Sequence, residues 1–425
     1  MTIRLGRSLL GSAGLRAANA GLGFAVAVVL ARTLGADGYG LYSTAFVVAS
    51  VCAIVVQFGL PNLVMRETAT AAVSEDWAHM RAVWGWAGRG AALFSLAVLT
   101  VGALVLFVLR DGMGAEHLWT YALALGLVPL LAFGALRAGA LRGLQHVVLA
   151  QVPEMIVKPG VMLALALMLG LAVPATANAA MAMQLAAVGM AFALGAVFLW
   201  RMAPKMTVGV VSDSGQRIMP TASSVVSFAM VAGSTQVNQY LDILTLSFFR
   251  SEAEVGVYRA AWQLSLLVGF GSAVGSAIFP TLFARYHASR NGVGLARALN
   301  IARGVAVATA LPLALLCFVI PREILSFLFG QEFIGGALVL VIFAALRLLM
   351  GAVGPLGPYL NMVGGERASG RAHLAAAGVN MVLNIALVPA FGVTGAAVST
   401  AVGYVVLSFV LIRQSWCINK SKIEP

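Results

Sequence analysis

Uncharged segments alternate with short charged loops along the whole chain. Because a helix needs about 20 residues to cross a hydrocarbon core about 30 Å thick, each long uncharged segment predicts a membrane span. Segments of at least this length cover residues 38–65, 90–109, 159–200, 218–241, 260–284 and 372–412. The segments 159–200 and 372–412 are each long enough for a pair of helices, with turns predicted at 174–178 and 389–395. Further segments at 15–31, 118–136, 304–320 and 336–363 complete twelve predicted spans.

The basic residues predict the orientation of these spans, since Lys and Arg are retained on the cytoplasmic side during insertion. With an inside N-terminus, the basic residues of the outside loops are only Arg32, Arg110, Arg250 and Arg322. Both termini are therefore expected inside the cell. This asymmetry also accounts for the formal net charge of +12, so the charge does not indicate a nucleic-acid partner.

The composition excludes a soluble protein, because 61% of the residues are hydrophobic and only 10% are charged. The loops are too short to fold as separate domains. The five histidines never occur at a metal-binding spacing, and no lysine follows a glycine as it does in a P-loop. We expect no metal, no cofactor and no enzyme activity.

The second half of the chain repeats the first weakly, at a nearly constant offset. Gly40 and Gly256 belong to similar loops that end in a Gly-x-Tyr pattern, and Pro61 and Pro280 end the spans that follow. Six spans per half predict an all-α membrane protein with two parallel repeats around a central cavity. The predicted parts are an N-terminal six-helix bundle (1–205), a cytoplasmic linker (206–219), a C-terminal six-helix bundle (220–413) and a cytoplasmic tail (414–425).

Several stretches in both halves carry a resemblance to a known family, among them LARTLGADGYGLY at 30–42 and NIALVPAFGVTGAA at 384–397. Through these stretches, and others at 59–69, 242–249, 255–261 and 329–333, the chain resembles the polysaccharide and O-antigen flippases of the multidrug/oligosaccharidyl-lipid/polysaccharide exporter superfamily. Family members often carry charged residues where Ile243 and Ala390 stand here, which leaves the particular glycan open.

The resemblance implies a flippase of the bacterial inner membrane that works by alternating access. Its substrate would be a polyprenyl-diphosphate-linked oligosaccharide, moved from the cytoplasmic to the periplasmic leaflet for lipopolysaccharide O-antigen, exopolysaccharide or capsule biosynthesis. A polysaccharide polymerase or the export machinery is a candidate partner.

Six ionisable residues fall within or just inside the predicted spans, and a basic residue at mid-span costs about 2.5 to 3.5 kcal/mol on insertion scales. Such residues usually face a partner or a wet cavity. Because guanidinium matches phosphate in bidentate geometry, the basic members are candidates for binding the diphosphate. They are Arg347, Arg16, Lys158 and Arg259.

Each candidate also has a simpler interpretation. Arg16 lies near the inside end of its span and could snorkel to the headgroups. Glu154 and Lys158 are spaced i,i+4, which favours mutual neutralisation over a ligand role. Arg259 stands at the outside end of a span, as interfacial anchors do. Only Arg347 is too far from both interfaces to snorkel, which favours a functional role.

A polar run at 234–242 ends at Asp242. Asp242, Asn238, Gln239 and the acidic Glu154 are the candidates for binding sugar or a coupling ion. The alternative is ordinary hydrogen bonding between helices, worth about 0.6 to 2 kcal/mol per contact in membranes. Asn380 and Asn384 face the same choice, and there we favour packing.

Pro355 and Pro358, together with Gly354, should break the span that carries Arg347, because proline removes a backbone hydrogen bond and clashes with the preceding turn. This break is a candidate gate. A static kink, which is common in membrane helices, is the alternative.

Three rival functions remain. A cation-coupled multidrug exporter of the same superfamily should have an acidic cavity, whereas the intramembrane excess here is basic. A membrane glycan polymerase or ligase would be expected to have a large outside loop. A structural scaffold would leave the position of Arg347 without a reason.

Overall fold

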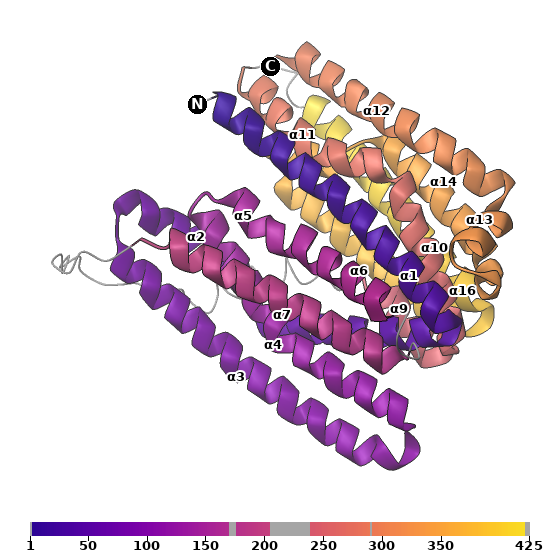
Figure 1. The fold of residues 1–425 in the computed structure, drawn as a ribbon. Coiled ribbons are helices and arrows are strands. Elements are labelled where there is room, and N and C mark those ends of the chain that lie inside the picture. The colour runs from indigo at the N-terminus through magenta and orange to yellow at the C-terminus, as the bar shows by residue number, and fades with distance from the viewer. Residues whose placement is uncertain (1, 170–175, 205–238, 290, 421–425) are drawn as a thin grey trace. The chain divides into compact units, whose positions relative to one another are not determined.

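The computed structural model describes residues 2–169, 176–204, 239–289 and 291–420, and every element in these ranges is helical (Figure 1). Eight of the helices are long and apolar enough to span a bilayer by length and composition, so the chain is a multi-pass membrane protein. They are Gly14–Gln57, Trp77–Gly112, Ala115–Gly143, Val147–Met168, Ala177–Met202, Gly292–Val319, Gln331–Met362 and Ala368–Trp416.

Three of these eight segments contain a glycine with a non-helical backbone. Gly35 and Gly392 stand where the sequence pattern separates two spans, and Gly354 interrupts the segment Gln331–Met362. Most of the predicted span at 218–241 lies outside the described residues. The span predicted at 260–284 was wrong as one helix, because the chain breaks at Gly269 between two shorter helices. The count of twelve spans therefore stays a prediction.

The chain divides into two compact units. The C-terminal unit contains Met1–Thr44 and Asn238–Pro425, and the N-terminal unit contains Ala45–Val237. The first helix thus groups with the C-terminal helices, whereas the sequence pattern assigned it to the N-terminal bundle at 1–205. The linker predicted at 206–219 lies outside the described residues.

The N-terminal unit is built around one helix, α4 (Ala115–Gly143), which packs against three others (Figure 1). Its neighbours are α2 (Leu60–Ser74), α3 (Trp77–Leu109) and α7 (Ala177–Met202). The unit also holds the end of α1 (Thr2–Gln57), the short helices η1 (Arg110–Gly112) and α5 (Val147–Val152), the π-helix η2 (Pro153–Val157) and α6 (Lys158–Leu169).

The predicted span at 38–65 was wrong in its boundary. Helix α1 ends at Gln57, and α2 begins at Leu60 after two residues with positive φ, Phe58 at 36° and Gly59 at 75°. Pro61 stands in the first turn of α2, where its missing N–H leaves no hydrogen bond unmade. The Gly-Leu-Pro sequence therefore starts a new helix and does not continue the span.

The C-terminal unit contains most of α1 and nine further elements of the described chain, among which α11, α12 and α14 pack side by side (Figure 1). These elements are α9 (Leu241–Phe249), α10 (Glu252–Val268), α11 (Phe270–Ala288), α12 (Gly292–Val319), α13 (Pro321–Leu328), η3 (Gln331–Gly336), α14 (Ala337–Val353), α15 (Leu356–Met362) and α16 (Glu366–Lys420).

The two repeated Gly-x-Tyr motifs contact each other inside the C-terminal unit. A Cβ atom on Gly40 would overlap the backbone carbonyl of Glu252, and one on Gly256 would overlap the carbonyl of Ala36. Only glycine lets the two helices approach this closely. The similarity of the motifs in the sequence thus has a physical reason, which is the crossing of α1 and α10.

Both helix kinks are capped by charged residues that were expected in outside loops. At the kink at Gly35, the Ala36 amide donates to Glu332 (2.8 Å), whereas the nearby Arg32 Nε donates to the carbonyl of Leu328 (2.8 Å), the last residue of α13. Beside the kink at Gly392, Arg250 Nη2 donates to the carbonyl of Pro389 (2.7 Å). The ends of broken helices leave such backbone groups without intrahelical partners, so these side chains stabilise the breaks.

Candidate functional site

Asp242 lies at the centre of a buried hydrogen-bond cluster in the C-terminal unit. Its Oδ2 accepts from Tyr258 Oη at 2.8 Å and from Thr400 Oγ1 at 2.6 Å. Its Oδ1 accepts from Asn384 Nδ2 at 2.8 Å and from Asn380 Nδ2 at 3.3 Å. The donors come from α10 and α16, and all five side chains are buried. The cluster ties the short helix α9 to two long ones.

The donors around Asp242 are neutral, and within the described part of the chain no basic side chain pairs with it. Four hydrogen bonds support the carboxylate but leave its charge uncompensated. Asn384 Oδ1 is also buried without a hydrogen-bond partner among the described residues. Carboxylate, amide and hydroxyl oxygens together form the ligand type that hard cations prefer.

The polar run that pointed to Asp242 did not supply its partners. Gln239 is exposed in the turn before α9, and Asn238 lies outside the described residues. Asn380 and Asn384, for which packing was favoured, bond directly to the carboxylate. Thr400 was missed, because a threonine in an apolar helix carries no charge signal.

Arg347 lies inside the C-terminal unit without a hydrogen-bond partner for two of its nitrogens. Its guanidinium carbon is 4.7 Å from the ring centroid of Trp262, and both Nε and Nη2 are buried and unpartnered among the described residues. Its Cδ is 3.0 Å from the position that a Cβ on Gly269 would take, so the break between α10 and α11 gives the side chain room. A buried cation that stacks on an aromatic ring but lacks an anion can still accept an anionic ligand.

An aromatic row joins the surroundings of Asp242 and Arg347. Phe343 packs edge-on against Tyr258 at 5.5 Å and against Trp262 at 5.0 Å between ring centroids. Tyr404 interacts electrostatically with both the carboxylate and the guanidinium. The free cation and the uncompensated anion are thus neighbours within one unit, but they do not form an ion pair.

The other basic candidates in this unit are less isolated. Arg259 is half-buried and interacts with the hydroxyl groups of Tyr39 and Tyr42. Arg16 is also half-buried, and its Nε has no hydrogen-bond partner among the described residues. Both residues stay candidates for binding the diphosphate.

The N-terminal unit contains a different charge cluster, in which the predicted pair is confirmed. Lys158 Nζ lies 3.5 Å from Glu154 Oε2 at the spacing i,i+4. Arg137 Nη2 lies 3.4 Å from Glu154 Oε1, and Arg137 Nη1 donates to the carbonyls of Ala191 (2.9 Å) and Phe192 (3.0 Å). Glu154 is therefore already engaged by two cations.

Arg137 was missed as a site residue because its position near the end of a span placed it in a loop. Its side chain is only 4% exposed. A Cβ on Gly195 would overlap the guanidinium, so the glycine in α7 makes the space for it. Glu154 lies in the π-helix η2, which begins at Pro153, and reaches Arg137 and Lys158 from there. Single-turn π-helices of this kind are frequent at functional sites.

The predicted helix break after Arg347 is confirmed. Helix α14 ends at Val353, Gly354 has a φ of 78°, and α15 begins at Leu356 with Pro355 and Pro358 on either side of its start. Arg303 Nε donates to the carbonyl of Val353 at 3.0 Å and so caps the broken end. The role of this break as a gate stays a prediction.

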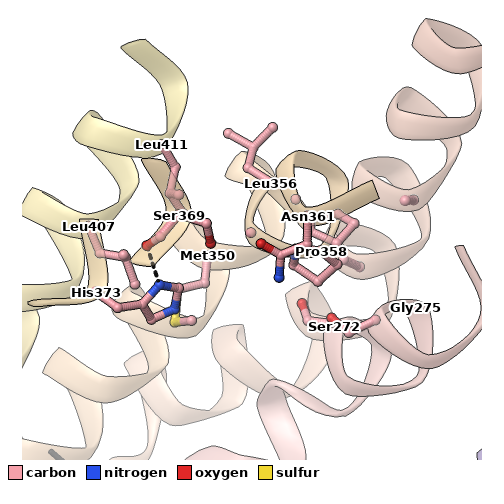
Figure 2. Close-up of a pocket in the computed structure, with 16 residues that line it drawn as sticks. Ser272, Gly275, Met350, Leu356, Pro358, Asn361, Ser369, His373, Leu407 and Leu411 are labelled. Atoms are coloured by element: carbon pink, nitrogen blue, oxygen red, sulfur yellow. Dashed lines mark hydrogen bonds between the residues drawn. The ribbon is translucent and has the colours of Figure 1, made fainter. Parts of the chain in front are cut away.

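A cavity of 280 Å³ lies beside the break, between α11, α12, α14, α15 and α16. Figure 2 shows Ser369 and His373 on one side of it and Ser272 and Asn361 on the other. Among the described residues, no Asp, Glu, Lys or Arg lines this cavity. The region around Asp242 and Arg347, in contrast, contains a buried carboxylate and a buried guanidinium.

Comparison with known proteins identifies the family to which the chain belongs. Residues 7–286 match the family described as "Polysaccharide biosynthesis protein". The chain is also 26% identical over 168 residues to the "Probable low-salt glycan biosynthesis flippase Agl15" of Haloferax volcanii, a match that covers 39% of this chain and 35% of that protein. The curated relatives are thus matched over much less than two thirds of their length.

Solved structures agree on the fold. A multidrug resistance MATE family transporter of the MOP superfamily superposes with a TM-score of 0.73 at 14% identity, over 97% of this chain and 99% of that one. The lipid II flippase MurJ gives a TM-score of 0.67 at 14% identity, over 93% and 85%. At this identity the likeness establishes that the chain shares the fold of these transporters and nothing more. On the family match, the chain belongs to the polysaccharide biosynthesis protein family.

Proposed function

We propose that the protein is a flippase that moves a polyprenyl-diphosphate-linked oligosaccharide from the cytoplasmic to the periplasmic leaflet for surface polysaccharide biosynthesis. It would work by alternating access in a bacterial inner membrane, with twelve spans in two six-helix repeats and both termini inside. The family membership and the flippase names of the relatives support a transporter of this kind rather than an enzyme.

The observation that carries this proposal is the buried guanidinium of Arg347, whose Nε and Nη2 have no hydrogen-bond partner among the described residues. A buried cation without an anion is costly, so it is retained where a ligand supplies the missing charge. A diphosphate brings about two negative charges and suits the planar fork of arginine. The membrane potential would favour outward movement, because two negative charges gain about 4.6 kcal/mol on leaving a cell with 100 mV negative inside.

The Asp242 cluster is proposed as the coupling-ion site. Its oxygen ligands suit Na⁺ or a proton, and Asn384 Oδ1 is an acceptor that still lacks a partner. The aromatic row from Tyr258 to Trp262 would let occupation of this site influence Arg347. Coupling of this kind requires the ion to bind one conformation more tightly than the other.

A cation-coupled multidrug exporter is the rival that the fold favours, since a MATE transporter has the same architecture. The chemistry around Arg347 argues against it, because a cationic drug would be repelled by a free guanidinium. A glycan polymerase or ligase has no support from the described structure.

The test is lipid co-purification. The wild-type protein, purified from its own membranes, should retain a diphosphate-linked saccharide lipid that mass spectrometry detects. Arg347→Ala should lose this lipid at normal protein abundance, and Arg347→Lys should keep part of it, since lysine keeps the charge but lacks the bidentate fork. Arg89→Ala is the matched control, because Arg89 is exposed and bonds only within its own helix. Normal lipid retention by Arg347→Ala would rule out the site.

A further inference from the structure

The uncharged cavity beside the α14 break has the chemistry of a sugar subsite. Ser272 offers a buried hydroxyl with no hydrogen-bond partner among the described residues. His373 Nδ1 lies 2.9 Å from the carbonyl of Ser369, and since a carbonyl only accepts, Nδ1 carries the proton. The second ring nitrogen, Nε2, and the amide of Asn361 add further polar atoms, so the described lining provides both donors and acceptors without an Asp, Glu, Lys or Arg side chain (Figure 2).

The remaining walls are apolar and smooth. Leu356, Pro358 and Leu407 line the cavity, together with the glycines of the break. A sugar ring carries hydroxyl groups on its rim and C–H groups on its faces, so it matches a cavity of mixed polar and apolar lining. The volume of 280 Å³ lies below the range of about 300 to 1,000 Å³ that is usual for drug-sized ligands. The cavity therefore suits one ring and not a whole oligosaccharide.

On each of two helices, α11 and α14, a residue that lines the cavity lies within one turn of Arg347 or of its contact residue Gly269. Arg347 contacts the start of α11 at Gly269, and Ser272 follows three residues later on that helix. Met350, which also lines the cavity, follows Arg347 by three residues on α14. One turn of helix advances by about 5.4 Å. A group bonded directly to a diphosphate at Arg347 could therefore reach the cavity.

We propose that this cavity binds the first sugar of the lipid-linked glycan, the ring attached to the diphosphate that Arg347 holds. The inference rests on the proposed function and deepens it, because it assigns recognition of the saccharide to uncharged groups at the helix break. Gly354 and Pro355 then shape a binding wall, since an unbroken helix would fill the space with side chains.

The experiment compares lipids with and without a sugar. The full-length protein in nanodiscs is titrated with polyprenyl diphosphate and with polyprenyl diphosphate carrying one glucose, galactose or N-acetylglucosamine. At least one sugar-bearing lipid should bind the wild type about tenfold more tightly than the bare diphosphate lipid, which corresponds to two or more good hydrogen bonds.

Two variants address the cavity itself. A Cβ on Gly357 would lie 3.7 Å from His373 Cε1 and 3.8 Å from Ser369 Oγ, so Gly357→Val fills the space without a backbone clash. Ser272→Ala removes an unpartnered hydroxyl, which should not destabilise the fold. Both should reduce the preference for the sugar-bearing lipid and leave the affinity for the bare lipid unchanged. Gly378→Val is the matched control, because nothing lies within 4 Å of that glycine's Cβ position and the site is exposed.

Different outcomes would contradict the sugar subsite and the proposed diphosphate site. A wild type without preference for any of the sugars, or cavity variants that keep the full preference, would overturn the sugar subsite while Arg347-dependent binding stands. If the wild type binds none of the lipids, or if Arg347→Ala binds them all as tightly, the diphosphate site itself fails and the subsite fails with it.

Discussion

The two units hold their intramembrane charges in opposite ways. In the N-terminal unit, Arg137 and Lys158 each lie within 3.5 Å of a carboxylate oxygen of Glu154, and Arg137 Nη1 also donates to two backbone carbonyls, although Arg137 Nε has no partner among the described residues. In the C-terminal unit, Arg347 has unpartnered nitrogens and Asp242 is surrounded by neutral donors. The first arrangement pairs each charge with an opposite charge, and the second, among the described residues, does not.

This contrast teaches that a charge inside a membrane helix has to be interpreted from its surroundings. A paired cluster is expected to hold helices together, so its loss should be seen in stability. An unpaired group stabilises the resting fold little, so its loss should be seen in binding. The same substitution, arginine to alanine, should therefore reduce the stability of the fold in the N-terminal unit and ligand binding in the C-terminal unit.

The largest effect is expected for Arg137→Ala. It would leave Glu154, whose side chain is 34% exposed, with only Lys158 as partner and would empty the space under Gly195. The cost should therefore lie near the lower end of the range of about 3 to 5 kcal/mol that applies to broken buried pairs. Protein abundance and the melting temperature in detergent would measure this loss, with Arg347→Ala as the comparison. Equal stability of the two variants would contradict the division between a structural and a ligand-binding unit.

The presence of many apolar spans and the position of the helix break could be predicted from the sequence, because each depends on local chemistry. A bilayer requires about 20 apolar residues, and proline removes a backbone hydrogen bond wherever it stands. Gly354 and Pro355 therefore marked the end of α14 correctly. Arg347 was also identified as a candidate, because the uncharged residues on either side of it can be counted in the sequence.

The partners of these residues could not be predicted, because they depend on how distant helices meet. Thr400 reaches Asp242 from 158 positions away in the chain, and a threonine in an apolar helix looks the same whether it packs or binds. Arg137 was assigned to a loop because a charge near a span end gives no sign of the direction of its side chain. The glycine opposite it, Gly195, explains the burial only after the fold is known.

An intermediate effect is expected for Asp242→Asn. If the cluster binds Na⁺, adding NaCl in place of KCl should raise the melting temperature of the wild type, since a ligand that binds only the folded state at 10 to 100 times its Kd stabilises it by about 1.4 to 2.7 kcal/mol. The neutral variant should lose this difference and keep its fold, because the asparagine still fills the site. A wild type that responds equally to both salts would leave the cluster with a packing role, or with a proton as its ion.

The smallest effect is expected for Lys158→Met. The side chains of Lys158 and Glu154 are 27% and 34% exposed, so solvent screens this pair more than it screens Arg137. A partly exposed pair of this kind contributes about 0 to 1 kcal/mol, and methionine keeps most of the packing volume. The variant should therefore melt within a few degrees of the wild type and retain its lipid. A defect in lipid retention at normal stability would show instead that Lys158 contacts the diphosphate, which would move part of the binding site into the N-terminal unit and end the contrast between the two clusters.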